Sequence, residues 1–480
     1  MESLWSKSVS LKKHNTLKDD IAVNTVVIGG GIAGLLIAYR LKEKGIKAIV
    51  IEAETICSGQ TKNTTAKITS QHGVIYSKIL SYYGENAAKE YARENEKAIS
   101  DYEKLIKHND IPCDFEQKKA VLYSVNNAEI IEKEADAAEK AGIECYVTNK
   151  TELPFSVKSA LVFENQAQFH PLKFLSEIAD DLEIYENTKA ICIKNNTVIT
   201  DKGNIKAENI VFACHFPFVN FPGLYFLKLN QERSYVVSAK QTKSLSGMYI
   251  DAEGGLSLRS YQNNILVGGG AHRTGKADSD NAFKFLERNA KMYFPEFMAE
   301  NDWSAQDCIS LDGIPYIGRL VSADSNVFVA TGFNKWGMTS AMVSANMISD
   351  MICGNNAYEN SIFSPSRFCV FASSKTIFQN AAETITGFSK YLCCAKLTAS
   401  DIKCGTAGII HYNGKKCGAY RRKGGTLYIV SLKCPHLKCF LNWNNTTKTW
   451  DCPCHGSRYD YKGNLLDNPA QKNSILIAKI

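Results

Sequence analysis

Thr25-Val-Val-Ile-Gly29-Gly30-Gly31-Ile-Ala-Gly34 is the stretch that decides the fold of this chain. A short β-branched run ends in glycines and an apolar helical pattern follows, which predicts a strand, a tight turn and a helix. Gly29 supplies the turn, Gly31 lets the backbone approach a pyrophosphate, and Gly34 allows close helix–strand contact. The N-terminus of the helix favours the phosphate charge. The stretch predicts a Rossmann-like dinucleotide site, and a glycine-rich turn without a ligand is the alternative.

The next two segments extend this site. A second strand is predicted at 48–51, and it ends in Glu52, whose carboxylate is placed to accept hydrogen bonds from a ribose. A loop rich in small hydroxyl residues, 58–73, follows directly. A capped turn before a helix is the alternative interpretation of this loop.

With this loop the chain resembles the D-amino-acid oxidase-like superfamily of FAD-dependent oxidoreductases, which includes glycine and sarcosine oxidases. In that family the loop wraps the pyrophosphate and the flavin, so the resemblance implies FAD rather than NAD. It covers roughly 22–360 and includes the segment 165–175, the turn Asp312-Gly313-Ile-Pro315-Tyr316-Ile-Gly318 and the strand–turn–helix from Val327. The residues expected at FAD are Gly29, Gly31, Gly34, Glu52, Ser58, Thr61, Thr64, Thr65, Lys67, Ala190, Gly332, Gly337 and Met338. A helix expected at 339–352 directs its positive N-terminus toward the flavin.

The expected fold class is an α/β Rossmann-like FAD-binding domain with an inserted α+β substrate domain, followed by a small all-β Rieske domain. An N-terminal extension (1–21) precedes the FAD-dependent oxidoreductase domain at 22–360. Its FAD-binding parts are expected at about 22–75, 160–220 and 300–360, and its substrate-domain parts at about 76–159 and 221–299. A linker at 361–394 with a short helix at 376–392 leads to the Rieske domain at 395–480. Long helices are expected at 76–108 and 128–141, and Asn413-Gly414 predicts a hairpin.

The C-terminal domain carries Cys434-Pro-His436-Leu-Lys-Cys439 and Cys452-Pro-Cys454-His455-Gly456-Ser457. Each loop offers one Cys and one His at short spacing. Two thiolates on one iron and two imidazoles on the other are the ligands of a Rieske [2Fe–2S] centre, here Cys434, Cys452, His436 and His455. A Cys₂His₂ zinc site is the alternative. Zinc sites usually pair like ligands, whereas each loop here mixes them, so the iron–sulfur cluster is favoured.

These loops closely resemble the Rieske proteins of cytochrome bc-type complexes. The resemblance implies a disulfide between the spare cysteines, Cys439 and Cys454, although a reducing cytosol favours free thiols. It also implies that Ser457 and Tyr459 donate hydrogen bonds to the cluster and to cysteine sulfur, which raises the reduction potential into the upper part of the Rieske range. A surface tyrosine is the alternative for Tyr459.

The overall composition is that of a soluble globular protein, with 45% hydrophobic and 22% charged residues. A net charge of +7 gives no support to nucleic-acid binding. We expect no transmembrane segment and no signal peptide, so the predicted compartment is the cytoplasm. The cysteines outside the cluster loops are interpreted as free thiols. The remaining histidines do not pair with an acid at ligand spacing, so an oxygenase with a mononuclear iron is not expected.

Flavin and cluster together predict an enzyme, a dehydrogenase-type oxidoreductase that passes electrons singly between FAD, the cluster and an external carrier. By resemblance the substrate is a small amine or amino acid, and the carrier a soluble protein or a quinone. The alternatives are an electron-transfer reductase without a C–N substrate and a redox sensor. No catalytic residue is assigned.

Two positions depart from the resemblance. Asp307 stands where amino-acid oxidases of the family place an arginine for the substrate carboxylate, so a carboxylate substrate needs Arg233, Arg259 or Arg273 instead. In the flavin loop, Lys62-Asn63 replaces the usual glycine-containing run, so local contacts are expected to differ.

Overall fold

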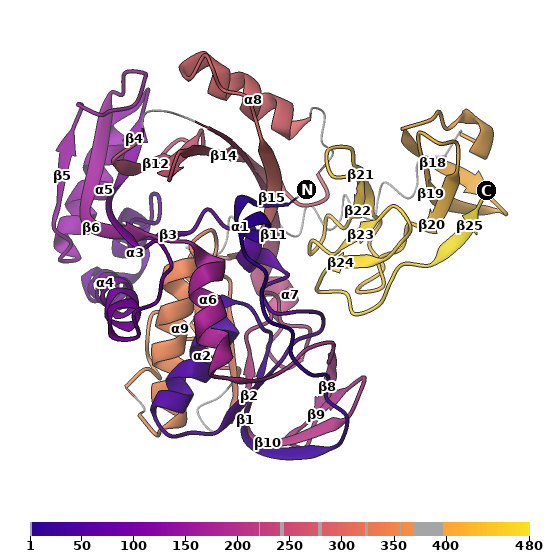
Figure 1. Cartoon of the computed structure of the whole chain (residues 1–480), viewed down its shortest axis with the longest axis horizontal. Coiled ribbons are helices and arrows are strands. Elements are labelled where there is room, and N and C mark those ends of the chain that lie inside the picture. The colour runs from indigo at the N-terminus through magenta and orange to yellow at the C-terminus, as the bar shows by residue number, and fades with distance from the viewer. Residues whose placement is uncertain are drawn as a thin grey trace.

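The computed structural model of the chain describes residues 2–219, 221–240, 244–276, 281–321, 325–355, 357–367 and 397–480. Four sheets organise these residues. Two large sheets and the helices form one part of the molecule, and the two small C-terminal sheets lie at one end of it (Figure 1).

The first large sheet is Rossmann-like. Its order is β16-β17-β10-β1-β2-β7, with β8 and β9 attached beside β10. The strands are β1 Ile21–Ile28, β2 Ala48–Ile51, β7 Glu183–Tyr185, β8 Ala190–Lys194, β9 Thr197–Thr200, β10 Asn204–Phe212, β16 Tyr316–Arg319 and β17 Val327–Thr331. Strands β1, β2, β7, β10 and β17 pair in parallel. Alternate residues enter two separate cores, Val27 one and Val26 the other, as expected for a parallel sheet that is buried on both faces.

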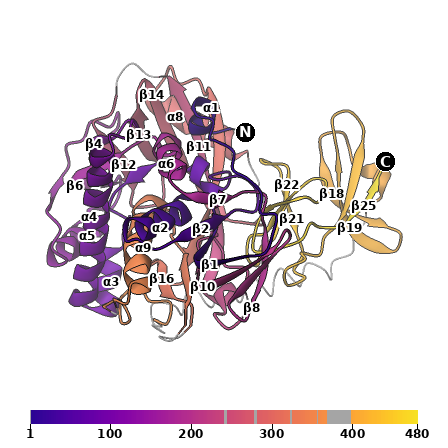
Figure 2. The same cartoon turned by 60° about the horizontal axis from the view of Figure 1, so that its bottom comes forward.

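Some helices pack on this sheet and others on the second large sheet, which is described below. They are α1 Leu4–Ser8, α2 Ile32–Glu43, α3 Tyr76–Tyr83, α4 Glu85–His108, α5 Ala128–Lys140, α6 Pro171–Asp180, α7 Tyr225–Lys228, α8 Ala282–Tyr293 and α9 Gly337–Ile352. Helices α2 and α9 lie side by side at the centre (Figure 2). The single helix expected at 76–108 is wrong, because Gly84 with φ 82° ends α3 and restarts the chain as α4. The helix expected at 376–392 lies outside the described residues.

The second large sheet consists mostly of strands from the predicted substrate-domain parts, and we call it the substrate-domain sheet. Its order is β15-β11-β14-β13-β12-β4-β6-β3, with β5 beside β6. The strands are β3 Lys67–Ile68, β4 Glu116–Ser124, β5 Cys145–Thr148, β6 Ser159–Gln168, β11 Leu229–Lys240, β12 Gly247–Asp251, β13 Ser257–Tyr261, β14 Asn264–Arg273 and β15 Asn301–Ser310. Its pairings are antiparallel except for β12 with β4.

The C-terminal domain is all β apart from a short 3₁₀ turn at Ala399–Asp401. Its two sheets have the orders β18-β19-β20-β25 and β21-β22-β23-β24. The strands are β18 Ala407–Tyr412, β19 Lys415–Arg421, β20 Leu427–Ser431, β21 Asn442–Asn444, β22 Thr449–Asp451, β23 Arg458–Asp460, β24 Leu465–Asp467 and β25 Leu476–Lys479. The hairpin predicted at Asn413-Gly414 joins β18 to β19, and both turn residues have positive φ. The expected fold class is confirmed, whereas the domain boundaries stay a prediction.

The two small sheets differ in their distance from the large part. The sheet of β21 to β24 lies against β11 and β15, and the sheet of β18, β19, β20 and β25 lies further out (Figures 1 and 2). Within the described part of the chain, no helix is long and apolar enough to cross a membrane.

We predict that Gly34→Ala destabilises the FAD-binding part strongly. A Cβ at Gly34 would lie 1.9 Å from the Gly29 carbonyl oxygen, so the helix must move away from the turn. The expected cost is about 3 kcal/mol or more, the upper end of overpacking. The temperature of FAD release, followed by flavin fluorescence, falls by about 6 °C or more. Gly424→Ala is the control, because a Cβ there meets nothing within 4 Å. Equal release temperatures for the two variants would contradict the prediction.

Candidate functional site

A cavity of about 480 Å³ opens at the carboxyl ends of β1, β2, β10 and β17. In an open α/β sheet this is the edge where ligands bind. Ten of the residues predicted at FAD line this cavity: Gly29, Gly31, Glu52, Ser58, Thr61, Thr64, Ala190, Gly332, Gly337 and Met338. Gly34, Thr65 and Lys67 do not line it.

The three glycines of the turn have different surroundings. A Cβ at Gly29, where φ is +116°, would lie 2.6 Å from the Ala213 carbonyl oxygen. A Cβ at Gly34 would clash with the Gly29 carbonyl oxygen. At Gly31 a Cβ would meet only the Thr61 hydroxyl, at 3.1 Å. Gly29 and Gly34 are therefore required by packing, while Gly31 leaves the backbone open toward the cavity, as close approach of a pyrophosphate needs.

Glu52 is fixed at the end of β2. Its carboxylate accepts hydrogen bonds from the backbone N–H groups of Gly30 (2.8 Å) and Glu54 (3.0 Å). Burial raises the pKa of this carboxyl group, and the backbone hydrogen bonds oppose that shift. The group is thus oriented and lines the cavity at the position expected for a ribose partner.

The flavin loop is held by side chains that the sequence did not point to. Trp5 of α1 donates its indole N–H to the Thr64 carbonyl (2.7 Å), and Trp303 of β15 donates to the Asn63 carbonyl (2.9 Å). Arg259 donates to the carbonyls of Thr65 and Ala66. These contacts join three distant segments of the chain, so no local pattern could have revealed them.

Lys67 lies behind the cavity. Its buried ammonium donates to the Tyr249 carbonyl (3.0 Å) and to the Ser257 hydroxyl (2.6 Å). Burial lowers its pKa well below the usual range, and Arg259 adds to that shift. The residue therefore joins the flavin loop to the substrate-domain sheet.

An acidic residue of β15 stands in the wall of the cavity. Asp307 lines the wall and accepts a hydrogen bond from the Ser234 hydroxyl (2.9 Å). Burial raises the pKa of Asp307 to about 6, although Lys335 and the Ser234 bond lower it. Lys335 itself pairs with Glu232 at 3.2 Å.

The three arginines considered for a substrate carboxylate are engaged elsewhere. Arg233 donates to the Ser304 hydroxyl, Arg259 holds the flavin loop, and Arg273 donates to carbonyls of the C-terminal domain. No arginine lines the cavity among the residues that the structure describes.

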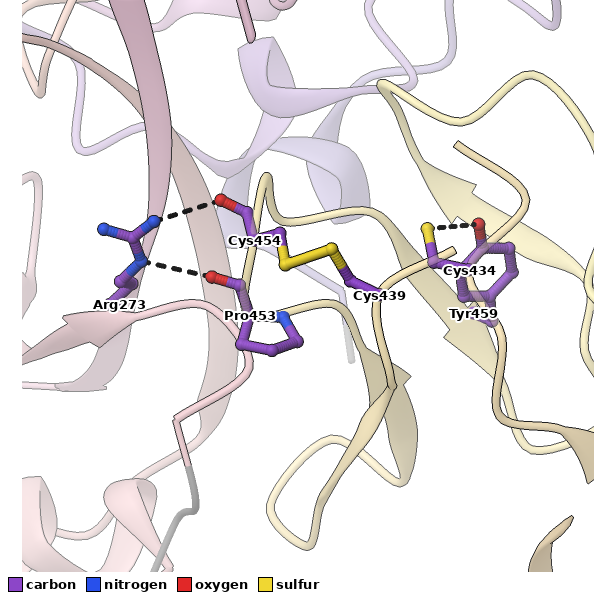
Figure 3. The surroundings of a disulfide bond; sticks show 6 residues. All are labelled: Arg273, Cys434, Cys439, Pro453, Cys454 and Tyr459. Atoms are coloured by element: carbon purple, nitrogen blue, oxygen red, sulfur yellow. Dashed lines mark hydrogen bonds between the residues drawn. A yellow bond between two sulfur atoms is a disulfide. The ribbon is translucent and has the colours of Figure 1, made fainter. Parts of the chain in front are cut away.

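The C-terminal loops place the predicted cluster ligands together. Cys439 and Cys454 form the expected disulfide, which joins the two loops (Figure 3). The Sγ atoms of Cys439, Cys452 and Cys454 lie within 4.8 Å of one another, but the disulfide removes two of them from metal binding. Cys434 and Cys452 remain as buried free thiols.

The donor set fits a [2Fe–2S] cluster. The rings of His436 and His455 lie 5.0 Å apart, and burial lowers their pKa values to about 4 and about 3, so both are neutral imidazoles. His455 Nδ1 is buried and has no hydrogen-bond partner among the residues that the structure describes, as expected of a nitrogen that binds a metal. The pKa of Cys434 is lowered, first by the hydrogen bond with the Cys452 thiol and then by the Tyr459 hydroxyl, whereas the same hydrogen bond raises the pKa of Cys452. Ligands of such a cluster are thiolates and neutral imidazoles.

The residues predicted around the cluster are also in place. The Tyr459 hydroxyl lies 3.5 Å from Cys434 Sγ (Figure 3), and Ser457 is fully buried. Ser457 Oγ accepts a hydrogen bond from the backbone N–H of Ala470 (3.0 Å), which leaves its own O–H to donate toward the thiols.

The second cluster loop is bound to the substrate-domain sheet. Arg273 of β14 donates to the carbonyls of Pro453 (3.2 Å) and Cys454 (3.0 Å) (Figure 3). Gln231 of β11 donates to the His455 carbonyl (2.9 Å). Gln306 of β15, which also lines the cavity, donates to the Gly456 carbonyl (2.8 Å).

Comparison with known proteins agrees with this arrangement. The family model for FAD dependent oxidoreductases matches residues 24–351. The chain belongs to the FAD-dependent oxidoreductase family. A second model, the Rieske [2Fe-2S] domain, matches residues 393–479 of this flavoprotein. The cofactors are therefore FAD and a Rieske [2Fe–2S] cluster, as expected, and the zinc alternative is wrong.

One relative matches nearly the whole chain, and two other proteins match about 70% of it. The flavoprotein is 34% identical to the Rieske 2Fe-2S iron-sulfur protein YhfW of Bacillus subtilis, over 98% of this chain and 96% of the relative. It is 20% identical to gamma-glutamylputrescine oxidoreductase of Escherichia coli, over 71% of this chain and 86% of that one. The crystal structure of glycine oxidase from Geobacillus kaustophilus superposes with a TM-score of 0.62 at 16% identity, over 72% of this chain and 99% of that one. At this identity the structural likeness shows a shared fold.

We predict that Tyr459→Phe lowers the reduction potential of the cluster. The change removes the hydroxyl near Cys434 Sγ and keeps the ring. A hydrogen bond of about 1–1.5 kcal/mol corresponds to a shift of about 40–60 mV for one electron. Potentiometric titration of the Rieske EPR signal measures it.

Tyr461→Phe is the matched control, because the ring of Tyr461 packs on Tyr420 and Tyr428 rather than near the ligands. Equal potentials for wild type and Tyr459→Phe, with the cluster retained, would show that the hydroxyl does not act on the sulfur.

Proposed function

We propose that this flavoprotein oxidises a small amine at FAD and passes the electrons singly through its Rieske cluster to an external carrier. The observation that carries this proposal is the position of Gln306. It lines the FAD cavity, and its side chain donates to the Gly456 carbonyl, next to the cluster ligand His455. One residue therefore contacts both redox sites within one molecule.

The chemistry of the two cofactors is complementary: bound FAD takes up two electrons with a hydride and can return them one at a time, and a [2Fe–2S] cluster carries one. The side chains of this protein fix the position of the cluster loop relative to the FAD cavity. Glutamine side chains at 231 and 306 fix the second cluster loop on the sheet. His455 is buried, with its ring 6.0 Å from that of Phe226, so this ligand faces the oxidoreductase domain rather than solvent.

The polar groups of the cavity support an amine rather than an amino acid. Asp307 takes the place at which family amino-acid oxidases have an arginine, and the described lining contains no arginine to replace it. The half-buried carboxylate of Asp307 can pair with a substrate ammonium and orient it. The name of the E. coli relative, gamma-glutamylputrescine oxidoreductase, also supports a C–N substrate.

The external partner is proposed to be a soluble one-electron carrier or a quinone, and the cytoplasm stays the predicted compartment. An electron-transfer reductase without a C–N substrate is the competing function. Anaerobic reduction of the flavin by an amine separates the two.

Under anaerobic conditions a diamine or another amine without a carboxylate is expected to bleach the flavin absorbance, and the reduced Rieske EPR signal should appear in the same sample. Stopped-flow absorbance followed by freeze-quench EPR measures both. Glycine and proline serve as carboxylate-bearing controls and are expected to react more slowly. If no amine bleaches the flavin while a reduced ferredoxin or a nicotinamide does, the protein is a reductase.

Asp307→Asn is expected to lower kcat/KM for the amine by roughly ten- to a hundredfold, because a charge-assisted hydrogen bond of about 1.5–3 kcal/mol is lost. In the wild type, Asp307 is neutral below its pKa of about 6 and cannot pair with an ammonium, so kcat/KM rises as the pH passes upward through about 6. Lys335, Glu232 and Arg233 are the charged groups that act on it.

The Asn variant should lack this acidic limb of the pH profile. Asp302→Asn, on the same strand but exposed to solvent, is the control and should keep it. An unchanged pH profile in Asp307→Asn would assign the limb to another group.

A further inference from the structure

The wall of the FAD cavity is completed by the C-terminal domain. Besides residues of the oxidoreductase domain, the lining includes residues of β24 and of the loop that follows it. They are Leu465, Leu466, Asp467, Asn468, Ala470, Gln471 and Asn473. This segment shares the wall with Glu52, Thr188 and Ala190, which stand at the ends of β2 and β8. These ends are the positions expected for the ribose and the adenine.

The segment is anchored to elements that border the FAD site. Lys189, next to β8, donates to the Gln471 carbonyl (2.7 Å), and Gln60 of the flavin loop donates to the Asp467 carboxylate (2.8 Å). Asn468 donates to the carbonyls of Cys214 and Phe216, which follow β10 (3.0 and 2.9 Å). The segment therefore crosses the cavity edge and is held along its length.

The polar side chains of the segment differ in what they have left to offer a ligand. The Asp467 carboxylate is already bonded within the protein, because it pairs with Arg458 at 2.6 Å and accepts a hydrogen bond from Gln60. Asn473 accepts from the backbone N–H of Leu465 (2.9 Å). The Gln471 amide makes no side-chain hydrogen bond with the residues that the structure describes, and it lines the cavity only half-buried. An amide offers both donors and an acceptor, which suits the edge of an adenine or the hydroxyls of a ribose.

We propose that the segment Leu465–Asn473 of the Rieske domain is part of the FAD-binding site. It covers the adenosine half of the cofactor, and Gln471 hydrogen-bonds to it. The proposal rests on the FAD residues assigned above and goes beyond them, because cofactor retention then depends on a domain outside the FAD-binding fold.

Hydrogen exchange tests the contact in the full chain with its cluster in place. The deflavinated protein and the same protein reconstituted with FAD are compared by mass spectrometry. FAD is expected to slow exchange in peptides that cover 465–473. The β18–β19 hairpin (Ala407–Arg421), in the outer sheet of the same domain, is the internal control and should not change. Bound FAD without protection of 465–473 would overturn the proposal.

A pair of adjacent substitutions tests the side chain. Gln471→Ala is expected to raise the dissociation rate of FAD, followed by the recovery of flavin fluorescence on dilution, by about tenfold. This corresponds to about 1.4 kcal/mol. Lys472→Ala, whose side chain is exposed and does not line the cavity, should stay within about twofold of wild type. The Rieske EPR signal should be unchanged in both, which excludes a general loss of the domain.

Equal dissociation rates for the two variants would show that the Gln471 side chain does not bind FAD. The exchange experiment would still decide whether the segment 465–473 covers the cofactor. Neither experiment uses a substrate, and the cluster is reduced chemically only to record its EPR signal. A failure of amine oxidation therefore leaves this proposal standing, and a failure here leaves the proposed reaction standing.

Discussion

Two buried glutamine amides determine how the two halves of this flavoprotein fit together. Gln306 Oε1 accepts from the Thr274 hydroxyl (3.3 Å), and its amide nitrogen donates to Gln231 Oε1 (2.6 Å) and to the Gly456 carbonyl. Gln231 donates in turn to the carbonyls of His455 and Asn468. Both side chains are buried, and all of their donor bonds except the one from Gln306 to Gln231 go to carbonyls of the Rieske domain. Leaving a buried donor unpaired costs about 1–3 kcal/mol, so the pair favours one docked arrangement.

Charge balance at the same interface supports that arrangement. Arg458 of the Rieske domain pairs with Asp451 (3.3 Å) and Asp467 (2.6 Å), all three largely buried. Arg233 approaches from β11, where burial lowers its pKa to about 10 and Arg458 adds to that shift, while the two aspartates oppose it. Across the contact, Arg233 thus faces a group of one cation and two anions in the Rieske domain. Such a buried set adds little net stability but penalises any docking that separates the charges.

The sequence could predict what depends on short spacing. The roles of Gly29 and Gly34, the four cluster ligands and the Asn413-Gly414 hairpin each follow from a few neighbouring residues. It could not predict contacts between segments hundreds of residues apart, such as Trp5 on the flavin loop or Gln306 on the cluster loop. These depend on the packing of whole sheets, and single Trp or Gln residues carry no pattern. Lys67 shows the converse case: it stands in the right loop, but it belongs to β3 of the second sheet, and its side chain bonds to Tyr249 and Ser257 of the same sheet rather than lining the cavity.

The docking also makes the two cluster histidines different. His455 is 6% exposed and lies on the oxidoreductase domain, near Phe226. His436 is only half-buried, and its neighbours Leu437 and Lys438 are exposed. A cluster that receives electrons from FAD and gives them to an external carrier needs a short protein contact on one side and access on the other. The glutamine pair and the Arg273 contacts therefore hold the domain so that His455 lies on the oxidoreductase domain, while His436 lies on the more exposed side.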